Sequence, residues 1–344
     1  MNERKASDST DSKPAIEQLS SIQSKLPQLK TPRIALVIPC YNEEEALKTT
    51  SNVVYEKLES LKDKQEIAND SFAIFIDDGS SDKTWQEIFT LHKTHEGVFH
   101  GLKFSHNRGH QNALYAGLMY ARQLGADAAI SMDADLQDDP NAIDGMVAEY
   151  RNGAEIVFGV RDNRDTDTVF KRGTAHAFYK LMHWLGTETI PDHADYRLMG
   201  KAALAALSQY TEVNLFLRGI VPSLGFKTAK VYYKRNKRVA GESKYPLHKM
   251  LSFAIEGVTS FSVKPLHMIT VIGGVSVIVG IIILIYTLLS LSNGHAQAGW
   301  TSLMCSLWII GGLILVALGV VGEYIGRIYL EVKARPRYII EEEV

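Results

Sequence analysis

The sequence contains almost no cysteine, since Cys40 and Cys305 are the only two in 344 residues. One lies in a polar part of the chain and the other in an apolar segment, so we expect no disulfide framework. The net charge is also small, at -2, and gives no reason to expect a nucleic acid as partner. The scarcity of cysteine agrees with a reducing compartment.

Two common phosphate-binding signatures are absent. No Gly-x-Gly-x-x-Gly follows the first apolar run, and the chain has no Gly-Lys-Ser/Thr loop. Hydride transfer through a dinucleotide fold and P-loop hydrolysis are therefore disfavoured. Without a glycine-rich cradle for phosphate, we expect a metal ion to bind any diphosphate.

The first 30 residues are polar and lack the apolar core of a signal peptide, so 1–30 is predicted to be a flexible tail. Two long apolar runs occur much later, Leu266–Leu291 and Trp300–Gly322, and neither contains Asp, Glu, Lys or Arg. Each exceeds the ~20 residues that cross a bilayer. The sequence predicts an integral membrane protein with two transmembrane helices within 266–326.

The charges that flank these runs predict their orientation. The connection 292–299 has no Lys or Arg, whereas basic residues lie outside both runs: Lys264, Arg327, Lys333, Arg335 and Arg337. By the positive-inside rule both termini and the large N-terminal part are cytoplasmic. The segment 327–344 is then a cytoplasmic tail.

The N-terminal part alternates between two kinds of pattern. Apolar runs predict strands at 33–38, 72–76, 98–104, 126–132 and 156–160. Helical patterns lie between them: one with Asn42 as N-cap that ends near Leu61, then 83–92, 111–124 and one opened by Pro140. This alternation predicts an α/β domain over 31–235 with a mostly parallel sheet, whose ligands bind at the carboxyl ends of the strands.

Polar residues gather where these strands end. They are Tyr41 to Glu43, Asp77 and Asp78, Asn107 to Gly109, and Asp133 to Gln137. In a parallel sheet these four loops meet at one rim. The sequence therefore favours a nucleotide-type site there.

Carboxylates are densest between residues 133 and 139. Asp133 and Asp135 are two apart and share a face of an extended strand end. Two adjacent carboxylates are costly unless a cation compensates them, and an oxygen-only ligand set suits Mg²⁺ or Mn²⁺. In the alternative interpretation this is an acidic strand-to-helix turn, with Asp138 or Asp139 as the helix N-cap. The two interpretations are compatible.

Several motifs, in order, resemble the inverting family 2 glycosyltransferases, which have a Rossmann-like GT-A fold. They are Val37-Ile-Pro-Cys-Tyr-Asn-Glu-Glu44, Asp77-Asp-Gly-Ser-Ser-Asp82, Asn107-Arg-Gly-His110 and Asp133-Ala-Asp-Leu-Gln-Asp-Asp-Pro140. Later motifs resemble the polyprenyl-phosphate glycosyltransferases within that family: Asp195-Tyr-Arg-Leu-Met199, Phe216-Leu-Arg-Gly219 and Arg238-Val-Ala-Gly-Glu-Ser-Lys-Tyr245. The resemblance covers about 33 to 335.

Two departures refine the resemblance. The Gln-x-x-Arg-Trp signature of processive polysaccharide synthases is absent, which argues against polymerisation. Where the subgroup often has Gly-Asp-Phe-Arg, this chain has His193-Ala-Asp-Tyr-Arg197. The role of Asp195 is therefore open between orienting the acceptor or an arginine and acting as a base.

The resemblance implies roles for individual residues. Nucleotide contacts would come from Pro39, Tyr41, Asn42, Glu43, Asp77, Asp78, Arg108, Gly109, Asp133 and Ala134. A Mg²⁺ or Mn²⁺ ion would be held by Asp133, Asp135 and Gln137. The residues that the resemblance implies for catalysis are Asp135, Asp195 and Arg197.

The implied acceptor is a lipid phosphate, and the chain offers many cations for it. Nine Lys or Arg face a single acid between Arg218 and Lys249. We expect phosphate contacts from Arg161, Arg172, Arg238, Ser243 and Lys244, while the other basic residues bind anionic lipid. Amphipathic patterns at 170–184 and 245–261 predict interfacial helices, although the first also suits packing on the soluble core. Residues 236–265 would form an acceptor loop and interfacial helix.

The expected function is the inverting transfer of one sugar, glucose from UDP-glucose, to undecaprenyl phosphate on the cytoplasmic face. A mannosyltransferase that uses GDP-mannose is the alternative within the same class. A non-catalytic, lipid-binding membrane scaffold is the alternative from another class. Homo-oligomerisation is compatible with the sequence. The histidines lack metal-ligand spacing and are expected to be structural or to lie at the surface.

Overall fold

The computed structural model describes residues 31–161, 193–213, 215–234 and 299–344, together with isolated positions between 266 and 285. The predicted tail 1–30 lies outside the described residues. So do both predicted amphipathic segments and four of the five predicted acceptor contacts: Arg172, Arg238, Ser243 and Lys244.

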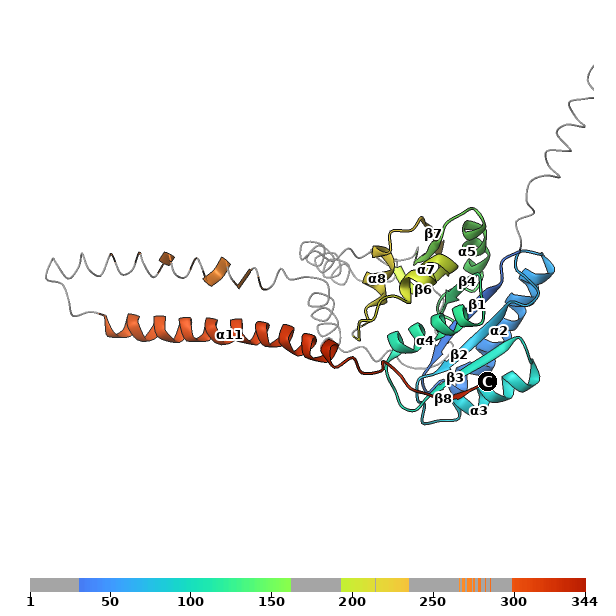
Figure 1. Cartoon of the computed structure of the whole chain (residues 1–344), viewed down its shortest axis with the longest axis horizontal. Coiled ribbons are helices and arrows are strands. Elements are labelled where there is room, and N and C mark those ends of the chain that lie inside the picture. Colours follow the sequence, from blue (N-terminus) through green and yellow to red (C-terminus); the bar gives the residue numbers. More distant parts are fainter. Residues whose placement is uncertain are drawn as a thin grey trace, which may run out of the picture.

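A single eight-stranded sheet in the order β7-β5-β6-β4-β1-β2-β3-β8 organises the described part of the chain (Figure 1). Its strands are β1 (Ile34–Cys40), β2 (Phe72–Asp77), β3 (Phe99–Phe104), β4 (Ala128–Ser131), β5 (Ile156–Arg161), β6 (His193–Gly200), β7 (Thr228–Tyr233) and β8 (Ile340–Glu343). All five predicted strands are present, and the α/β fold class is confirmed.

The sheet is mixed. Strands β3, β2, β1 and β4 run parallel, as the alternation of strands and helices predicts. Strand β6 is antiparallel to both β4 and β5, and β8 is antiparallel to β3. The central strands β1 and β2 are buried along their whole length, because helices cover both faces of the sheet.

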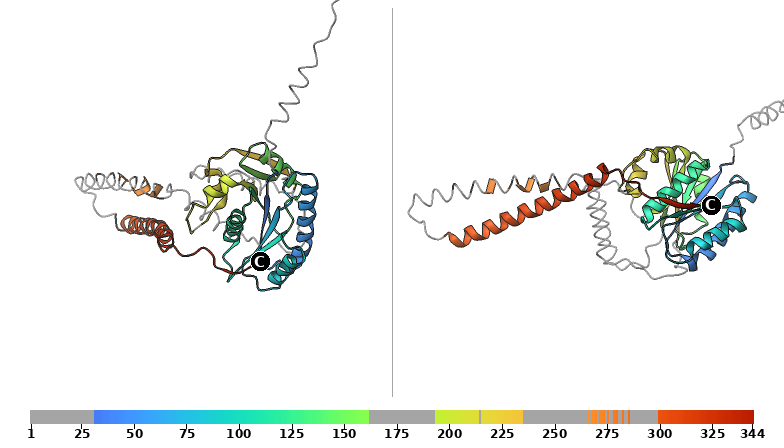
Figure 2. Two further views of the ribbon diagram at one scale, coloured as in Figure 1. Left: turned by 45° about the vertical axis from the view of Figure 1, so that its right-hand side comes forward. Right: turned by 60° about the horizontal axis from the view of Figure 1, so that its bottom comes forward.

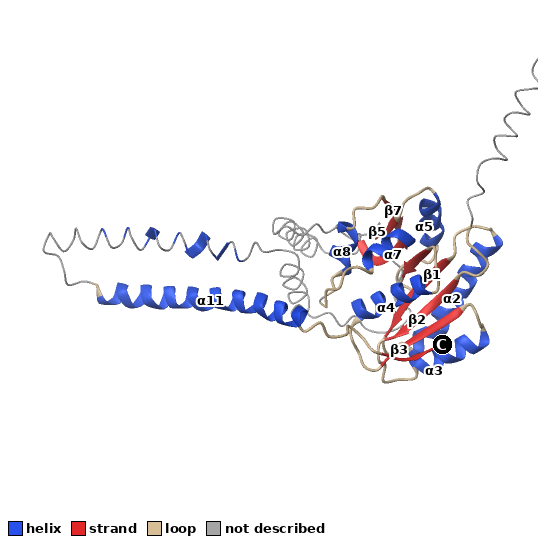
Figure 3. Ribbon diagram, viewed as in Figure 1, coloured by secondary structure: helices blue, strands red, loops and turns tan. Residues whose placement is uncertain are grey.

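The helices form two layers (Figure 3). Helices α2 (Glu44–Asp63), α3 (Thr84–Thr94) and α5 (Ala142–Arg151) pack on one face, through side chains such as Leu58, Ile88 and Met146. Helices α4 (His110–Gln123), α7 (Lys201–Leu207) and α8 (Leu217–Ser223) pack on the other, through Leu114, Leu204 and Ile220. The sheet separates two apolar cores.

A long apolar helix, α11 (Trp300–Val332), extends away from the sheet domain (Figure 2). Its stretch Ile310–Val332 is long and apolar enough to cross a membrane and is not buried inside the protein. It is the one such helix in the described part of the chain. The second predicted span falls on α11, while most of the first, 266–291, lies outside the described residues.

The chain then returns to the sheet domain, which the sequence analysis did not predict. Gly101 and Val344 exchange two backbone hydrogen bonds, at 2.7 and 3.0 Å. The ring of Tyr338 stacks on Phe104 with centroids 5.0 Å apart, and Trp85 Nε1 donates to Glu342 at 3.1 Å. Strand β8 thus covers the edge of β3, which would otherwise expose unpaired backbone groups.

Deletion of residues 338–344 should lower the free energy of unfolding of the sheet domain by about 3 kcal/mol, because backbone pairing and the stacked tyrosine are both lost. The matched control is Glu341→Gln. It removes only the ion pair with Lys103 at 3.2 Å and should cost less than about 1 kcal/mol. Thermal unfolding in detergent measures both; equal losses would contradict an edge-covering role.

Candidate active site

The loops after β1 and β2 are joined to each other. The backbone N–H of Asn42 donates to Ser80 Oγ at 2.9 Å, and Asn42 Oδ1 accepts the N–H of Ser81 at 2.9 Å. Asn42 has a left-handed φ of 54°. The prediction of Asn42 as N-cap is wrong: Glu43 occupies that position and α2 begins one residue later. The side chain of Asn42 instead fixes the second loop.

The two predicted nucleotide-binding aspartates on β2 and its loop have different surroundings. Both oxygens of Asp78 accept backbone N–H groups, from Arg108 at 2.6 Å and Gly109 at 2.9 Å. Asp77 Oδ1 accepts the N–H of Ser80 at 2.9 Å, whereas its Oδ2 is buried and has no hydrogen-bond partner among the described residues. Burial raises the pKa of both carboxyl groups. Asp78 therefore holds the loop before α4, and Asp77 keeps an unsatisfied acceptor.

Other predicted nucleotide contacts lie along the same rim. Pro39 is buried within β1, and Tyr41, just beyond the strand, is 50% exposed. Glu43 donates its backbone N–H to Thr84 Oγ1 at 3.0 Å. Gly79 has a φ of 66°, and a Cβ there would lie 2.4 Å from the backbone of His106. Only glycine permits this approach, which brings the loops after β2 and β3 together.

The loop after β4 carries the predicted metal ligands. Asp135 Oδ1 accepts the N–H of Gln137 at 3.1 Å, and the carbonyl of Ala134 accepts Thr50 Oγ1 at 2.6 Å. No group of three or more His, Cys, Asp or Glu side chains in the described residues is arranged to hold a metal. Paired carboxylates without a protein cage fit Mg²⁺ or Mn²⁺, which retain waters and bind substrate phosphates.

Asp133 occupies an electrostatically strained position. Loss of solvation, and then repulsion from Asp138, Asp195 and Asp135, raise its pKa to about 6, although His110 opposes this. The side chain is still 41% exposed. A cation bound at Asp133 would relieve that repulsion.

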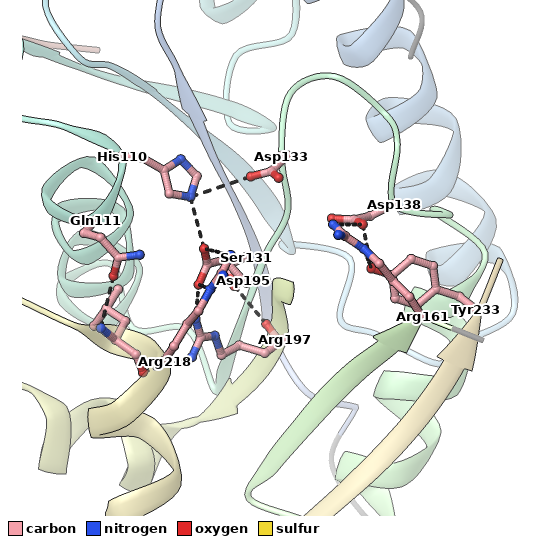
Figure 4. Close-up of polar contacts among 11 residues, drawn as sticks. His110, Gln111, Ser131, Asp133, Asp138, Arg161, Asp195, Arg197, Arg218 and Tyr233 are labelled. Carbon is pink, nitrogen blue, oxygen red and sulfur yellow. Dashed lines mark hydrogen bonds and ion pairs between the residues drawn. The ribbon is translucent and has the colours of Figure 1, made fainter. Parts of the chain in front are cut away.

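Asp195 lies on the neighbouring strand β6 inside a cluster of positive charge (Figure 4). Its Oδ1 accepts Arg197 Nη2 at 2.5 Å, and Arg218 forms a two-pronged contact at 3.2 Å to Oδ1 and 3.0 Å to Oδ2. His110 Nε2 is 3.7 Å from Asp195 Oδ2 and 3.7 Å from Asp133 Oδ1. Asp195 and Asp133 therefore face the same histidine.

The surroundings of Asp195 keep it ionised. Burial opposes ionisation, but the guanidinium groups of Arg218 and Arg197 hold the pKa of Asp195 well below its usual range. Arg197 is 1% exposed and its Nη1 also donates to the carbonyl of Leu217 at 3.1 Å. The backbone N–H of Leu217 in turn donates to Gln111 Oε1 at 3.0 Å. The cluster thus joins β6, α8 and α4.

Arg161 is the one predicted acceptor contact within the described residues. Its Nη2 lies 3.2 Å from Asp138 Oδ1, and Tyr233 OH donates to the same oxygen at 2.5 Å. Asp138 is not a helix cap, since α5 begins at Ala142 with Asn141 as N-cap. Asp139 Oδ1 does accept the backbone N–H of Asn141, at 2.9 Å, at the entry to this helix. Asp138 is used instead as a buried partner of Arg161 and Tyr233.

Two members of the site, His110 and Arg218, were not among the predicted site residues. His110 belongs to the motif Asn107-Arg-Gly-His110 and Arg218 to Phe216-Leu-Arg-Gly219. These motifs were a usable signal. However, neither a single histidine without metal-ligand spacing nor one arginine among many gave a reason to assign that particular residue to the site. Their proximity to Asp195 arises from the packing of α4 and α8 against β6.

Comparison with known proteins places these residues in a family context. The family model described as "Glycosyl transferase family 2" matches residues 35–207. A Bacillus subtilis (strain 168) protein named uncharacterized glycosyltransferase YkoT is 49% identical and covers 90% of this chain and 91% of its own. The SfII prophage-derived bactoprenol glucosyl transferase of Shigella flexneri is 39% identical, with 90% and 98% covered.

Similarity to solved structures is much weaker. The Pyrobaculum calidifontis mannosyltransferase PcManGT, solved with GDP-Man and Mn²⁺, is 15% identical with a TM-score of 0.42, covering 72% of this chain and 77% of its own. Because the similarity is so low, nothing about the ligands of this chain is inferred from the ligands of that structure.

Asp195→Asn should lower the free energy of unfolding by about 3–5 kcal/mol, because Arg197 would remain buried without its counter-charge. Asp70→Asn is the matched control: Asp70 is 69% exposed in its ion pair with Arg33, so its loss should cost less than about 1 kcal/mol. Denaturant unfolding in detergent compares the two. A loss of less than about 1 kcal/mol in Asp195→Asn would contradict the cluster.

The stability difference between wild type and Asp195→Asn should depend on pH in a defined direction. The folded-state pKa of Asp195 is lowered, so its stabilising contribution is complete above the unfolded value near ~3.9 and is lost as pH falls below it. We expect the stability difference between wild type and Asp195→Asn to shrink as pH falls below about 4. A difference that widened on acidification would contradict this assignment.

Proposed function

Because the chain belongs to glycosyl transferase family 2, we propose that it transfers one glucose from UDP-glucose to polyprenyl (undecaprenyl) phosphate with inversion at the anomeric carbon. The observation that carries the proposal is the position of Asp195, which lies between Arg197 and Arg218 and shares His110 with Asp133. Donor-side carboxylates and acceptor-side cations thus meet at one point of the rim. The bactoprenol glucosyl transferase named above supports this acceptor and sugar.

The donor nucleotide binds along the loops after β1 and β2 in this proposal. The buried Oδ2 of Asp77, which has no hydrogen-bond partner in the described part of the chain, suits an N–H of a base or a ribose hydroxyl, since a buried acceptor without a partner is costly. Tyr41, half exposed at the end of β1, offers a ring to stack on the base. Asp78 contributes indirectly by holding Arg108 and Gly109 in place.

Mg²⁺ or Mn²⁺ is the proposed cofactor, with Asp133, Asp135 and Gln137 as its protein contacts. The ion, when bound, neutralises the charge that develops on the leaving nucleoside diphosphate. The chain's own contribution is to keep two carboxylates together at the end of β4. A cation bound there would relieve the repulsion around Asp133.

The acceptor phosphate itself is the proposed nucleophile. A phosphate monoester is largely dianionic at neutral pH, because its second pKa is near ~6. One of its oxygens attacks the anomeric carbon, and the bond from that carbon to the nucleoside diphosphate breaks with its electrons on the leaving oxygen. No general base is required, and Asp195, whose lowered pKa makes it a weak base, orients Arg218 and His110 instead.

The two arginines beside Asp195 have different proposed roles. Arg218 is 36% exposed and offers the acceptor phosphate a guanidinium already aligned by Asp195. Arg197 is almost fully buried, so its proposed role is to fix Asp195. Arg172, Arg238, Ser243 and Lys244 remain proposed acceptor contacts on the basis of the family resemblance. The apolar helix α11 supports attachment to a membrane, with the sheet domain on the cytoplasmic side.

Purified protein in detergent with Mn²⁺, undecaprenyl phosphate and a panel of radiolabelled UDP- and GDP-sugars tests the reaction. We expect label from UDP-glucose to enter the lipid phase and Asp135→Ala to lower that rate at least 100-fold, because a carboxylate beside the leaving diphosphate is lost. Transfer from GDP-mannose instead would establish the mannosyltransferase. Folded protein that binds lipid but transfers no sugar would refute the enzyme and favour a scaffold.

Metal affinity should depend on pH through Asp133. With a pKa of about 6, Asp133 is mostly protonated at pH 5 and mostly ionised at pH 7, and metal must displace the proton. We expect Mn²⁺ affinity, measured by electron paramagnetic resonance of free Mn²⁺, to fall about tenfold from pH 7 to 5. Asp133→Asn should bind more weakly without that dependence; an unchanged wild-type affinity at pH 5 would argue against Asp133 as a ligand.

A further inference from the structure

The loop of residues 132–139 is fixed by a second polar group, separate from the Asp195 cluster (Figure 4). Asp138 is 2% exposed and accepts both Tyr233 OH, at 2.5 Å, and Arg161 Nη2, at 3.2 Å, on Oδ1. Arg161 Nε also lies 3.3 Å from Tyr233 OH. These three side chains come from three separate segments: the loop itself, β5 and β7.

The backbone on either side of Asp138 is held as well. Tyr196 OH donates to the carbonyl of Asp139 at 3.0 Å, and its ring meets that of Tyr233 edge-on at 5.3 Å. At the other end of the loop, Thr50 holds the carbonyl of Ala134. Between these points Leu136 has a left-handed φ of 52°, which a bulky residue adopts only where its surroundings enforce it.

We propose that Tyr233 is a positioning residue for the donor-side loop: with Arg161 it fixes Asp138, and through the loop backbone it sets the places of Asp133 and Asp135. The inference rests on the proposed function, in which those two carboxylates contact the metal. It also gives Arg161 a different role from the one the sequence suggested. The guanidinium supports the loop through Asp138, and the acceptor phosphate is left to other cations.

The physical reason is the cost of burying Asp138. A buried carboxylate must be compensated by charge and hydrogen bonds, so it holds its partners in one arrangement. Removal of the phenol hydroxyl leaves Asp138 with one hydrogen bond fewer and releases the loop toward other conformations. Groups that orient metal ligands in this way commonly change metal affinity 10–100-fold when they are lost.

Tyr233→Phe tests the proposal, with Tyr150→Phe as the matched control. Tyr150 OH donates to the carbonyl of Asp127 at 2.9 Å, so the control removes one comparable hydroxyl before β4 rather than after it. In full-length, metal-free protein, hydrogen exchange of peptides that cover 132–139 should be about tenfold faster in Tyr233→Phe and unchanged in Tyr150→Phe. Equal exchange in the two variants would overturn the proposal.

Binding and kinetics then separate positioning from acceptor contact. We expect Tyr233→Phe to weaken Mn²⁺ binding about tenfold and to raise the KM for the sugar nucleotide, with the KM for lipid phosphate within about twofold of wild type. Arg161→Lys keeps the positive charge but loses the several N–H donors of the guanidinium. It should change Mn²⁺ affinity and the KM for the sugar nucleotide in the same direction, but by less. A rise confined to the acceptor KM in Arg161→Lys would overturn the proposal in favour of phosphate contact.

Failure of the proposed function is distinguishable from failure of this inference. If wild type binds no Mn²⁺, the proposed metal site is refuted, while hydrogen exchange in metal-free protein still judges the positioning role. If Tyr233→Phe does not fold, Asp138→Asn, which keeps the shape of the side chain, enters the same measurements. Exchange of 132–139 in Asp138→Asn at the wild-type rate would overturn the proposal.

Discussion

A buried carboxylate shared by two guanidinium groups sets the geometry of the site. Asp195 carries its charge into a nearly solvent-free position, which is unfavourable unless cations and hydrogen bonds compensate it. Arg197 and Arg218 provide that compensation, and the contacts of Arg197 and Leu217 extend it to α8 and α4. Because all these groups must be satisfied together, strand β6 and the two helices adopt one arrangement relative to one another.

Strand β6 connects this cluster to the donor side. It pairs antiparallel with β4 so that Ser131 lies opposite Arg197, and Ser131 Oγ donates to the carbonyls of Asp195 and Arg197. Asp195 therefore comes alongside the point where β4 ends and Asp133 begins the acidic loop. An antiparallel strand inserted into a mainly parallel sheet is what brings two carboxylates distant in sequence to the same histidine.

The two polar groups have complementary effects on the proposed reaction. The Asp195 cluster presents positive charge toward an anionic acceptor, and the group of Asp138, Arg161 and Tyr233 holds the loop that faces the donor. Neither requires the protein to move protons during transfer, because the phosphate acceptor is already charged. Catalysis in this proposal depends on positions and fields set before the substrates arrive.

The sequence by itself determined the family, the five parallel-type strands, the clustering of polar loops at their ends and the apolar segment of α11. These features follow from local patterns, in which apolar residues recur every two positions, recur every three to four positions, or form an uninterrupted run. Its motifs also predicted Asp133, Asp135, Asp195 and Arg197 as site residues. Only the tertiary structure decided which side chains meet: His110 with Asp133 and Asp195, Arg161 with Asp138, Asp78 with backbone N–H groups, and β8 with β3. Such pairings depend on strand register and helix packing between segments as many as 257 residues apart, and no local pattern encodes them.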